Sequence, residues 1–153
     1  MSDIRNKLGV HSFVWEHGWS RDQATSAINQ TAKAGFDFIE APSLDPSSID
    51  PSVTAKLLEE AGMGIAFSMG LDFESDISSG DPEKEKRGKA LLLDAVRVCR
   101  DCGGNSIGGI LYSGFGKYYE QPTAHGIRRS ADILREVAEE AAKSDINLCL
   151  EVV

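Results

Sequence analysis

The chain lacks the features that mark several classes of protein. It has no run of about 18 apolar residues, so the sequence predicts no transmembrane helix, and its first residues lack the apolar stretch of a secretory signal. No cluster of lysine and arginine stands out, and 16 basic against 24 acidic residues leave a net charge of −8. Proteins that bind nucleic acid or anionic membranes usually carry the opposite balance, so we expect neither partner.

Cysteine is also scarce. Three cysteines in 153 residues do not form the disulfide framework of a small secreted domain, and they favour a cytoplasmic location. Cys99 and Cys102 have C-x-x-C spacing, but they fall at the end of an expected helix and no second pair exists. Helix packing is therefore favoured over a redox or zinc site. The glycine pairs at 103–104 and 108–109 match no phosphate-binding pattern, which argues against nucleotide binding.

The sequence does contain an alternation of short apolar runs and amphipathic segments. The apolar runs lie at residues 8–15, 36–41, 65–69, 106–112 and 146–153. Helices are expected between them, with Ser20, Asp50 and Asp81 as N-terminal caps and proline directly after each aspartate. Strands that alternate with helices predict a parallel sheet with right-handed crossovers, here in one domain over residues 1–153.

Two architectures fit this order of elements. One is a five-stranded doubly wound sheet of the flavodoxin type, and the other is the first part of a (β/α)8 barrel, which needs about 250 residues. The chain stops on the apolar run 146–153, whereas natural domain ends are usually exposed and polar. We therefore expect an incomplete α/β chain that supplies about the first five strands and four helices of a (β/α)8 TIM barrel.

Candidate binding residues collect where the expected strands end, because binding groups of parallel α/β folds lie there. The strand ends and the loops beyond them offer His11, Ser12, Glu16, His17, Trp19, Glu40, Ser68, Asp72, Tyr112, Phe115 and Glu151. Carboxylates, imidazoles and aromatic rings on one rim suit a hydroxyl-rich ligand or a divalent metal ion.

Within this set, Glu151 is the strongest candidate, because a carboxylate within an apolar strand needs a cation or hydrogen-bond donors. For Glu40, an ion pair with a lysine or arginine of a neighbouring strand is favoured. His11 fits a hydrogen-bonded core position as well as a pocket wall, and Trp19 fits packing better than ligand contact.

Four segments of the chain resemble ketose 3-epimerases of the D-tagatose/D-psicose and L-ribulose group, within the xylose-isomerase-like barrels. The segments are residues 9–15, 35–40, 68–71 and 150–153, in the same order and with matching strand spacing. The resemblance implies a (β/α)8 barrel that holds one divalent ion, usually Mn²⁺ or Co²⁺ and alternatively Mg²⁺. It also implies a small ketose as substrate, and we expect a homo-oligomer, either a dimer or a tetramer.

The resemblance also assigns roles by position. It makes Glu151 the first metal ligand and one of two catalytic carboxylates. It also implies that the substrate pocket is lined by His11, Trp19, Ser68, Ile110 and Phe115. His11 and Ser68 depart from the tagatose-type members, which carry an aromatic residue and a cysteine there, so the preferred sugar stays open. The other metal ligands and the second catalytic glutamate would lie beyond Val153.

These roles fit epimerisation of a free ketose at C3. Two carboxylates on opposite faces can remove and return the C3 proton, while a metal ion stabilises the enediolate. One alternative is another enzyme on the same barrel, such as a hydroxypyruvate isomerase, an inosose dehydratase or a metal-dependent endonuclease. A second is a complete, non-catalytic half-barrel that dimerises or pairs with a second polypeptide. The 153-residue chain alone is expected to be inactive.

Overall fold

The strands and helices alternate along the chain. The computed structural model describes residues 6–42 and 45–153, and in these residues it forms five strands and four α-helices. The strands are β1 (Gly9–His11), β2 (Phe38–Pro42), β3 (Gly64–Leu71), β4 (Ser106–Gly114) and β5 (Asn147–Leu150). The helices are α1 (Arg21–Lys33), α2 (Pro51–Ala61), α3 (Pro82–Asp101) and α4 (Ala124–Ala142), with the 3-10 turns η1 (Ser12–Val14) and η2 (Pro46–Ser48). None of the described helices is long and apolar enough to cross a lipid bilayer.

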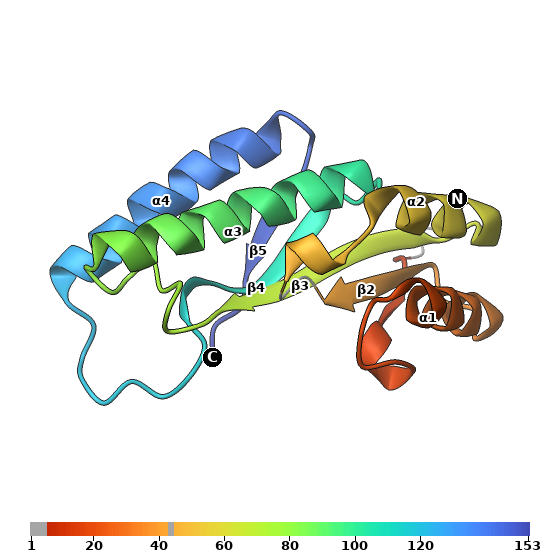
Figure 1. The fold of residues 1–153 in the computed structure, drawn as a ribbon, viewed down its shortest axis with the longest axis horizontal. Helices are drawn as coiled ribbons and strands as arrows, with labels where there is room; N and C mark the ends of the chain where they lie inside the picture. The colour runs from red at the N-terminus through yellow and green to blue at the C-terminus, as the bar shows by residue number, and fades with distance from the viewer. Residues whose placement is uncertain (1–5, 43–44) are drawn as a thin grey trace.

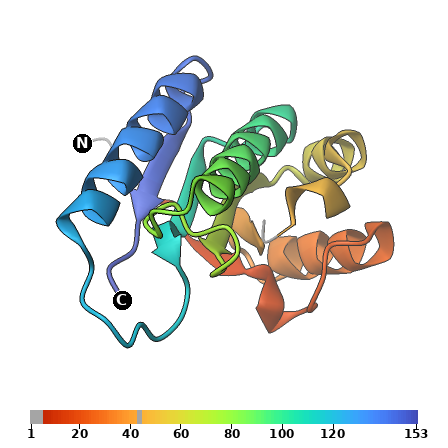
Figure 2. The same cartoon turned by 60° about the vertical axis from the view of Figure 1, so that its left-hand side comes forward.

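The order of the strands decides between the two architectures. The sheet runs β1-β2-β3-β4-β5 with every neighbouring pair parallel. A flavodoxin-type sheet has the order 2-1-3-4-5 and carries helices on both faces. Here consecutive helices pack beside one another along the outside of a curved sheet (Figure 1), from α4 in blue to α1 in orange in Figure 2. The barrel prediction is therefore confirmed, and the doubly wound alternative is excluded.

The helices begin where side chains satisfy their first backbone N–H groups. Ser20 forms a capping box at the start of α1, and Asp50 and Asp81 each accept hydrogen bonds from two N–H groups at the starts of α2 and α3. These caps confirm the sequence prediction. Thr123 caps α4 in the same way, and α2 ends at Gly62, whose φ of 64° is the left-handed conformation that glycine tolerates best.

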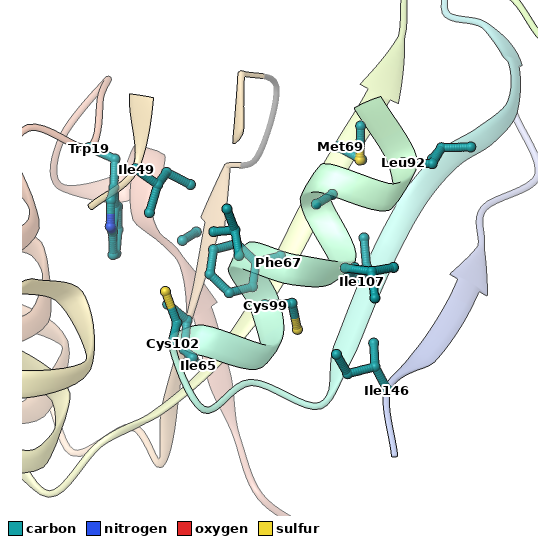
Figure 3. Close-up of a cluster of buried hydrophobic side chains, with 14 of the residues drawn as sticks. Trp19, Ile49, Ile65, Phe67, Met69, Leu92, Cys99, Cys102, Ile107 and Ile146 are labelled. Carbon is teal, nitrogen blue, oxygen red and sulfur yellow. The ribbon is translucent and has the colours of Figure 1, made fainter. Parts of the chain in front are cut away.

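The core lies between the sheet and the helices. Phe67 and Ile107, from neighbouring strands, are fully buried beneath Leu92 and Cys99 of α3, as Figure 3 shows. Successive side chains of a strand point to opposite faces. The alternate residues of β2 and β3 therefore lie on the concave face, where they are only partly buried. This concave face is the interior of the barrel.

The first and last strands are shorter than the apolar runs that predicted them. β1 ends at His11, because the imidazole Nδ1 accepts a hydrogen bond from the Phe13 N–H at 3.1 Å and so caps the turn η1. The expected strand 8–15 is thus replaced by three strand residues and a 3-10 turn. β5 ends at Leu150, although its apolar run continues to residue 153.

Candidate functional site

The carboxyl ends of the strands surround a cavity of about 650 Å³ on the concave face. Active sites of (β/α)8 barrels lie at this end. Each strand, or the loop after it, contributes to the lining: His11, Glu40, Ser68, Ile110, Phe115 and Glu151. Of the metal-binding and pocket residues that the resemblance assigns, all except Trp19 therefore line one cavity.

Trp19 lies away from this cavity. It is 7% exposed and belongs to the core (Figure 3), and its indole N–H donates to Thr54 Oγ1 of α2 at 3.1 Å. The turn η1 leads the chain out of the sheet, so that residue 19 arrives at the start of α1, in the helical layer. The packing environment that the sequence favoured for Trp19 is confirmed, and Trp19 is not among the residues that line this cavity.

Other candidates from the sequence also fall outside the cavity lining. Ser12 is fully buried in η1, and its hydroxyl has no hydrogen-bond partner among the described residues. Tyr112 lines a second cavity, which lies beside α4. Cys99 and Cys102 are buried, and burial raises the pKa of Cys99 to about 11 and that of Cys102 to about 12. The packing interpretation of the two cysteines is confirmed.

His11 and Ser68 are joined across the intervening strand β2. His11 Nε2 lies 3.1 Å from Ser68 Oγ, while His11 Nδ1 accepts the Phe13 N–H. A ring nitrogen that accepts a hydrogen bond carries no proton, so the proton of the neutral imidazole is on Nε2 and is donated to Ser68. The Ser68 hydroxyl can therefore donate its own proton to a ligand in the cavity.

The surroundings of Glu40 differ from the ion pair that was expected from the sequence. Glu40 lies beside His11 in the register of β1 and β2, lines the cavity and is only partly buried. Among the described residues, no lysine or arginine nitrogen lies within 4.0 Å of its carboxylate, so the expected ion pair is not formed in this part of the chain. Its oxygens can instead accept hydrogen bonds from a ligand.

Glu151 follows the last residue of β5. Its backbone N–H donates to the Gly109 carbonyl at 3.0 Å, which continues the sheet by one hydrogen bond, and its side chain lines the cavity. Carboxylate oxygens are suitable ligands for Mn²⁺ and Mg²⁺, so Glu151 fits one position of a metal site. Within residues 6–42 and 45–153, no three histidine, cysteine, aspartate or glutamate side chains gather to hold a metal ion. This part of the chain therefore contains no complete metal site.

The β3–α3 and β4–α4 loops form the rim of the cavity. The Asp72 carboxylate accepts hydrogen bonds from the Ser75 hydroxyl and from two backbone N–H groups, and these bonds, that of the hydroxyl first, hold the pKa of Asp72 below its ordinary value. Asp72 therefore serves to shape its own turn. Phe115 donates its N–H to the Leu71 carbonyl at 2.6 Å, and its side chain is 66% exposed at the cavity.

Comparison with known proteins identifies the family to which this fold belongs. Residues 28–153 match the family described as "Xylose isomerase-like TIM barrel". The chain is 39% identical over 147 residues to an L-ribulose 3-epimerase of Mesorhizobium japonicum, covering 96% of this chain and 50% of that protein. It is 37% identical to a ketose 3-epimerase of Arthrobacter globiformis, covering 96% of this chain and 51% of that protein.

A solved structure agrees with these relatives. The crystal structure of a D-allulose 3-epimerase from Methylomonas sp. in complex with D-allulose matches 97% of this chain with a TM-score of 0.94, at 36% identity and over 52% of that chain. This chain belongs to the xylose isomerase-like TIM barrel family. It spans about half the length of the curated relatives that it matches.

Proposed function

We propose that this chain supplies the N-terminal part of the active site of a metal-dependent ketose 3-epimerase. The observation that carries the proposal is the convergence of His11, Ser68 and Glu151 on one cavity at the carboxyl end of the sheet. The names of the relatives support it, because L-ribulose, ketose and D-psicose 3-epimerases align with nearly the whole of this chain.

The lining of the cavity suits a sugar with free hydroxyl groups. Ser68 offers a hydrogen-bond donor and Glu40 offers acceptors, while Ile110 and Phe115 offer apolar surface to the C–H faces of the ring or chain. A site built to bond hydroxyl groups discriminates strongly against ligands that lack them, because its buried polar groups would then stay unpaired. We propose a free ketose such as D-psicose, D-fructose, D-tagatose or L-ribulose.

Glu151 is proposed to transfer the proton at C3. Epimerisation requires a base on one face of the carbon and an acid on the other, and a carboxylate can serve in either role. A divalent ion, Mn²⁺ or Co²⁺, held by Glu151 and by ligands from barrel strands that follow β5, would stabilise the negative charge that develops on the ketose oxygens. The proposal places the second proton-transferring carboxylate on those following strands as well.

The test is exchange of the C3 proton with solvent. A complete barrel that contains this chain is incubated in D₂O with Mn²⁺ and each of the four ketoses, and we expect deuterium at C3 of both epimers. Hydroxypyruvate, inosose and abasic DNA are assayed beside the sugars. Turnover confined to one of these three compounds would assign the alternative reaction, and a lack of exchange with every ketose would reject the proposal. The 153-residue chain alone is expected to show no exchange.

A further inference from the structure

The Tyr118 hydroxyl joins the two loops at the rim of the cavity. It donates to Asp76 Oδ2 at 2.6 Å and accepts the Gly114 N–H at 2.9 Å. Asp76 is 3% exposed, and its other oxygen accepts the N–H and the hydroxyl of Ser78 at 2.8 and 2.7 Å. Burial, and then the hydrogen bond to Asp76, raise the pKa of Tyr118, so the phenol keeps the proton that it donates.

This junction holds the backbone beside Phe115. Gly114, whose N–H is bound by Tyr118, directly precedes Phe115, and the Phe115 N–H is bound by the Leu71 carbonyl. The packing is close, because a Cβ atom at Gly114 would lie 3.1 Å from both the Tyr118 hydroxyl and the Phe73 ring. The rings of Phe73 and Tyr118 meet edge to face at a centroid distance of 5.1 Å. Two successive N–H groups are thus fixed, that of Phe115 by Leu71 of β3 and that of Gly114 by Tyr118, which is itself bound to Asp76 of the β3–α3 loop.

Phe115 is the side chain that this backbone presents to the cavity. It lines both the candidate site and the second cavity beside α4, so it forms part of the wall between them. Since its side chain is 66% exposed, its place depends chiefly on the backbone that carries it. An aromatic wall contributes most to binding when it is already in position before the ligand arrives.

We propose that Tyr118 and Asp76 are positioning residues that hold Phe115 against a bound ketose. The inference rests on the proposed function, because only that function makes Phe115 a substrate wall. Tyr118 would not touch the sugar, and its effect would pass through Gly114 and Phe115. The expected signature of its loss is weaker substrate binding with little change in the chemical step.

The first experiment compares two tyrosines that lie side by side in the sequence. Tyr118→Phe removes the hydroxyl, which frees the Gly114 N–H and takes one donor from Asp76. Tyr119→Phe is the matched control, because Tyr119 is 90% exposed. In the complete barrel, we expect Tyr118→Phe to raise KM for the ketose about fivefold with kcat changed less than about twofold, and we expect the control to change neither. Equal kinetics in both variants would overturn the proposal.

A double-mutant cycle tests whether Tyr118 acts through Phe115. In the background of Phe115→Ala, Tyr118→Phe should have no further effect on KM, and a full additional loss would overturn the proposal. Amide hydrogen exchange supplies a readout that needs no turnover: we expect Gly114 and Phe115 to exchange at least about tenfold faster in Tyr118→Phe. Unchanged exchange would refute the positioning role. Absence of turnover in the parent barrel would reject the proposed function, and with it the ketose contact.

Discussion

The hydrogen bond between His11 and Ser68 determines which group the cavity offers to a ligand. The Phe13 N–H occupies His11 Nδ1, so Nε2 must donate across the 3.1 Å to Ser68 Oγ. The imidazole N–H is thereby used within the protein, and the donor left for the ligand is the serine hydroxyl. Ser68 is therefore expected to affect sugar binding directly, whereas His11 acts by orienting it.

Replacing Ser68 with alanine should weaken sugar binding without unfolding the protein. The change removes the one hydrogen-bond donor that His11 and Ser68 together offer to a ligand. We therefore expect kcat/KM for the preferred ketose to fall about tenfold, as for the loss of one hydrogen bond. Ser106→Ala is the control. Ser106 lies on the same face of the sheet as Ser68, but it is the first residue of β4, at the end of the strand remote from the cavity, and it does not line the cavity. Steady-state kinetics of both variants, with unfolding curves, make the comparison. An equal loss in both would contradict the role of Ser68.

The two buried thiols should make the protein less stable at high pH. Burial raises the pKa of Cys99 from an ordinary value of 9.0 to about 11 and that of Cys102 to about 12. Because the unfolded chain releases these protons first, their contribution to stability is full below about pH 9 and is lost as pH rises toward 11 and 12. Each thiol should then lower the free energy of unfolding by up to about 1.4 kcal/mol per pH unit within this range.

The measurement is urea unfolding between pH 8 and 10.5. We expect the double variant Cys99→Ala, Cys102→Ala to be less stable at pH 8 but to lose stability less steeply as pH rises. Cys149→Ala is the control, since Cys149 is exposed. A double variant with the slope of the parent would show that the thiols are not the groups that titrate.

Gly88, in the middle of α3, should not tolerate alanine. Helix propensity alone favours alanine over glycine by about 1 kcal/mol. A Cβ atom at Gly88 would, however, lie 2.0 Å from the Ser75 carbonyl oxygen and 2.6 Å from Ile77 Cγ2. The Ser75 carbonyl is part of the backbone and cannot rotate away, so the clash outweighs the gain in helix propensity. We therefore expect Gly88→Ala to lower the free energy of unfolding by about 1–3 kcal/mol. Gly35→Ala is a useful comparison. No atom lies within 4 Å of the added Cβ, so its expected cost of about 1–2 kcal/mol comes from the backbone φ of 84° alone. Chemical denaturation measures both, and a stabilised Gly88→Ala would contradict the packing.

Local features of the fold could be predicted from the sequence, and features set by distant contacts could not. Ser20, Asp50 and Asp81 were identifiable as caps because capping depends on residues two or three positions away. Packing was favoured for Trp19 from the sequence, but its contact with Thr54 and the surroundings of Glu40 needed the structure. The position of Trp19 depends on the turn η1, and the surroundings of Glu40 depend on which strands lie beside β2. The contact of Tyr118 with Asp76 spans 42 residues between two loops and has no sequence pattern.

The 153-residue chain should associate with itself. In the described residues, β1 and β5 each pair on one side only, and Leu150 and Val152 beside the β5 edge are 51% and 96% exposed. Unpaired edges with apolar side chains favour association between chains. We expect sedimentation velocity to show oligomers at about 100 µM, and the variant Leu150→Lys, Val152→Lys to shift them toward monomer. Tyr119→Lys, which removes an exposed aromatic residue of the β4–α4 loop and changes neither edge strand, should leave the distribution unchanged. A parent chain that sediments as one monomeric species would contradict this prediction.

Glu151 and Glu40 should differ in what they contribute to the reaction. Glu151 is expected to transfer the C3 proton and to bind the metal, so Glu151→Gln in the complete barrel removes both the base and the charge. We expect it to reduce C3 deuterium exchange by at least about 10³-fold and to lower the metal content. Glu40→Gln keeps an amide oxygen as acceptor at the cavity wall, so we expect a higher KM with substantial turnover and unchanged metal content. Solvent-deuterium incorporation measured beside metal analysis distinguishes the two. Near-normal exchange in Glu151→Gln would overturn its assignment as the base, and loss of exchange in Glu40→Gln with full metal content would transfer that assignment to Glu40.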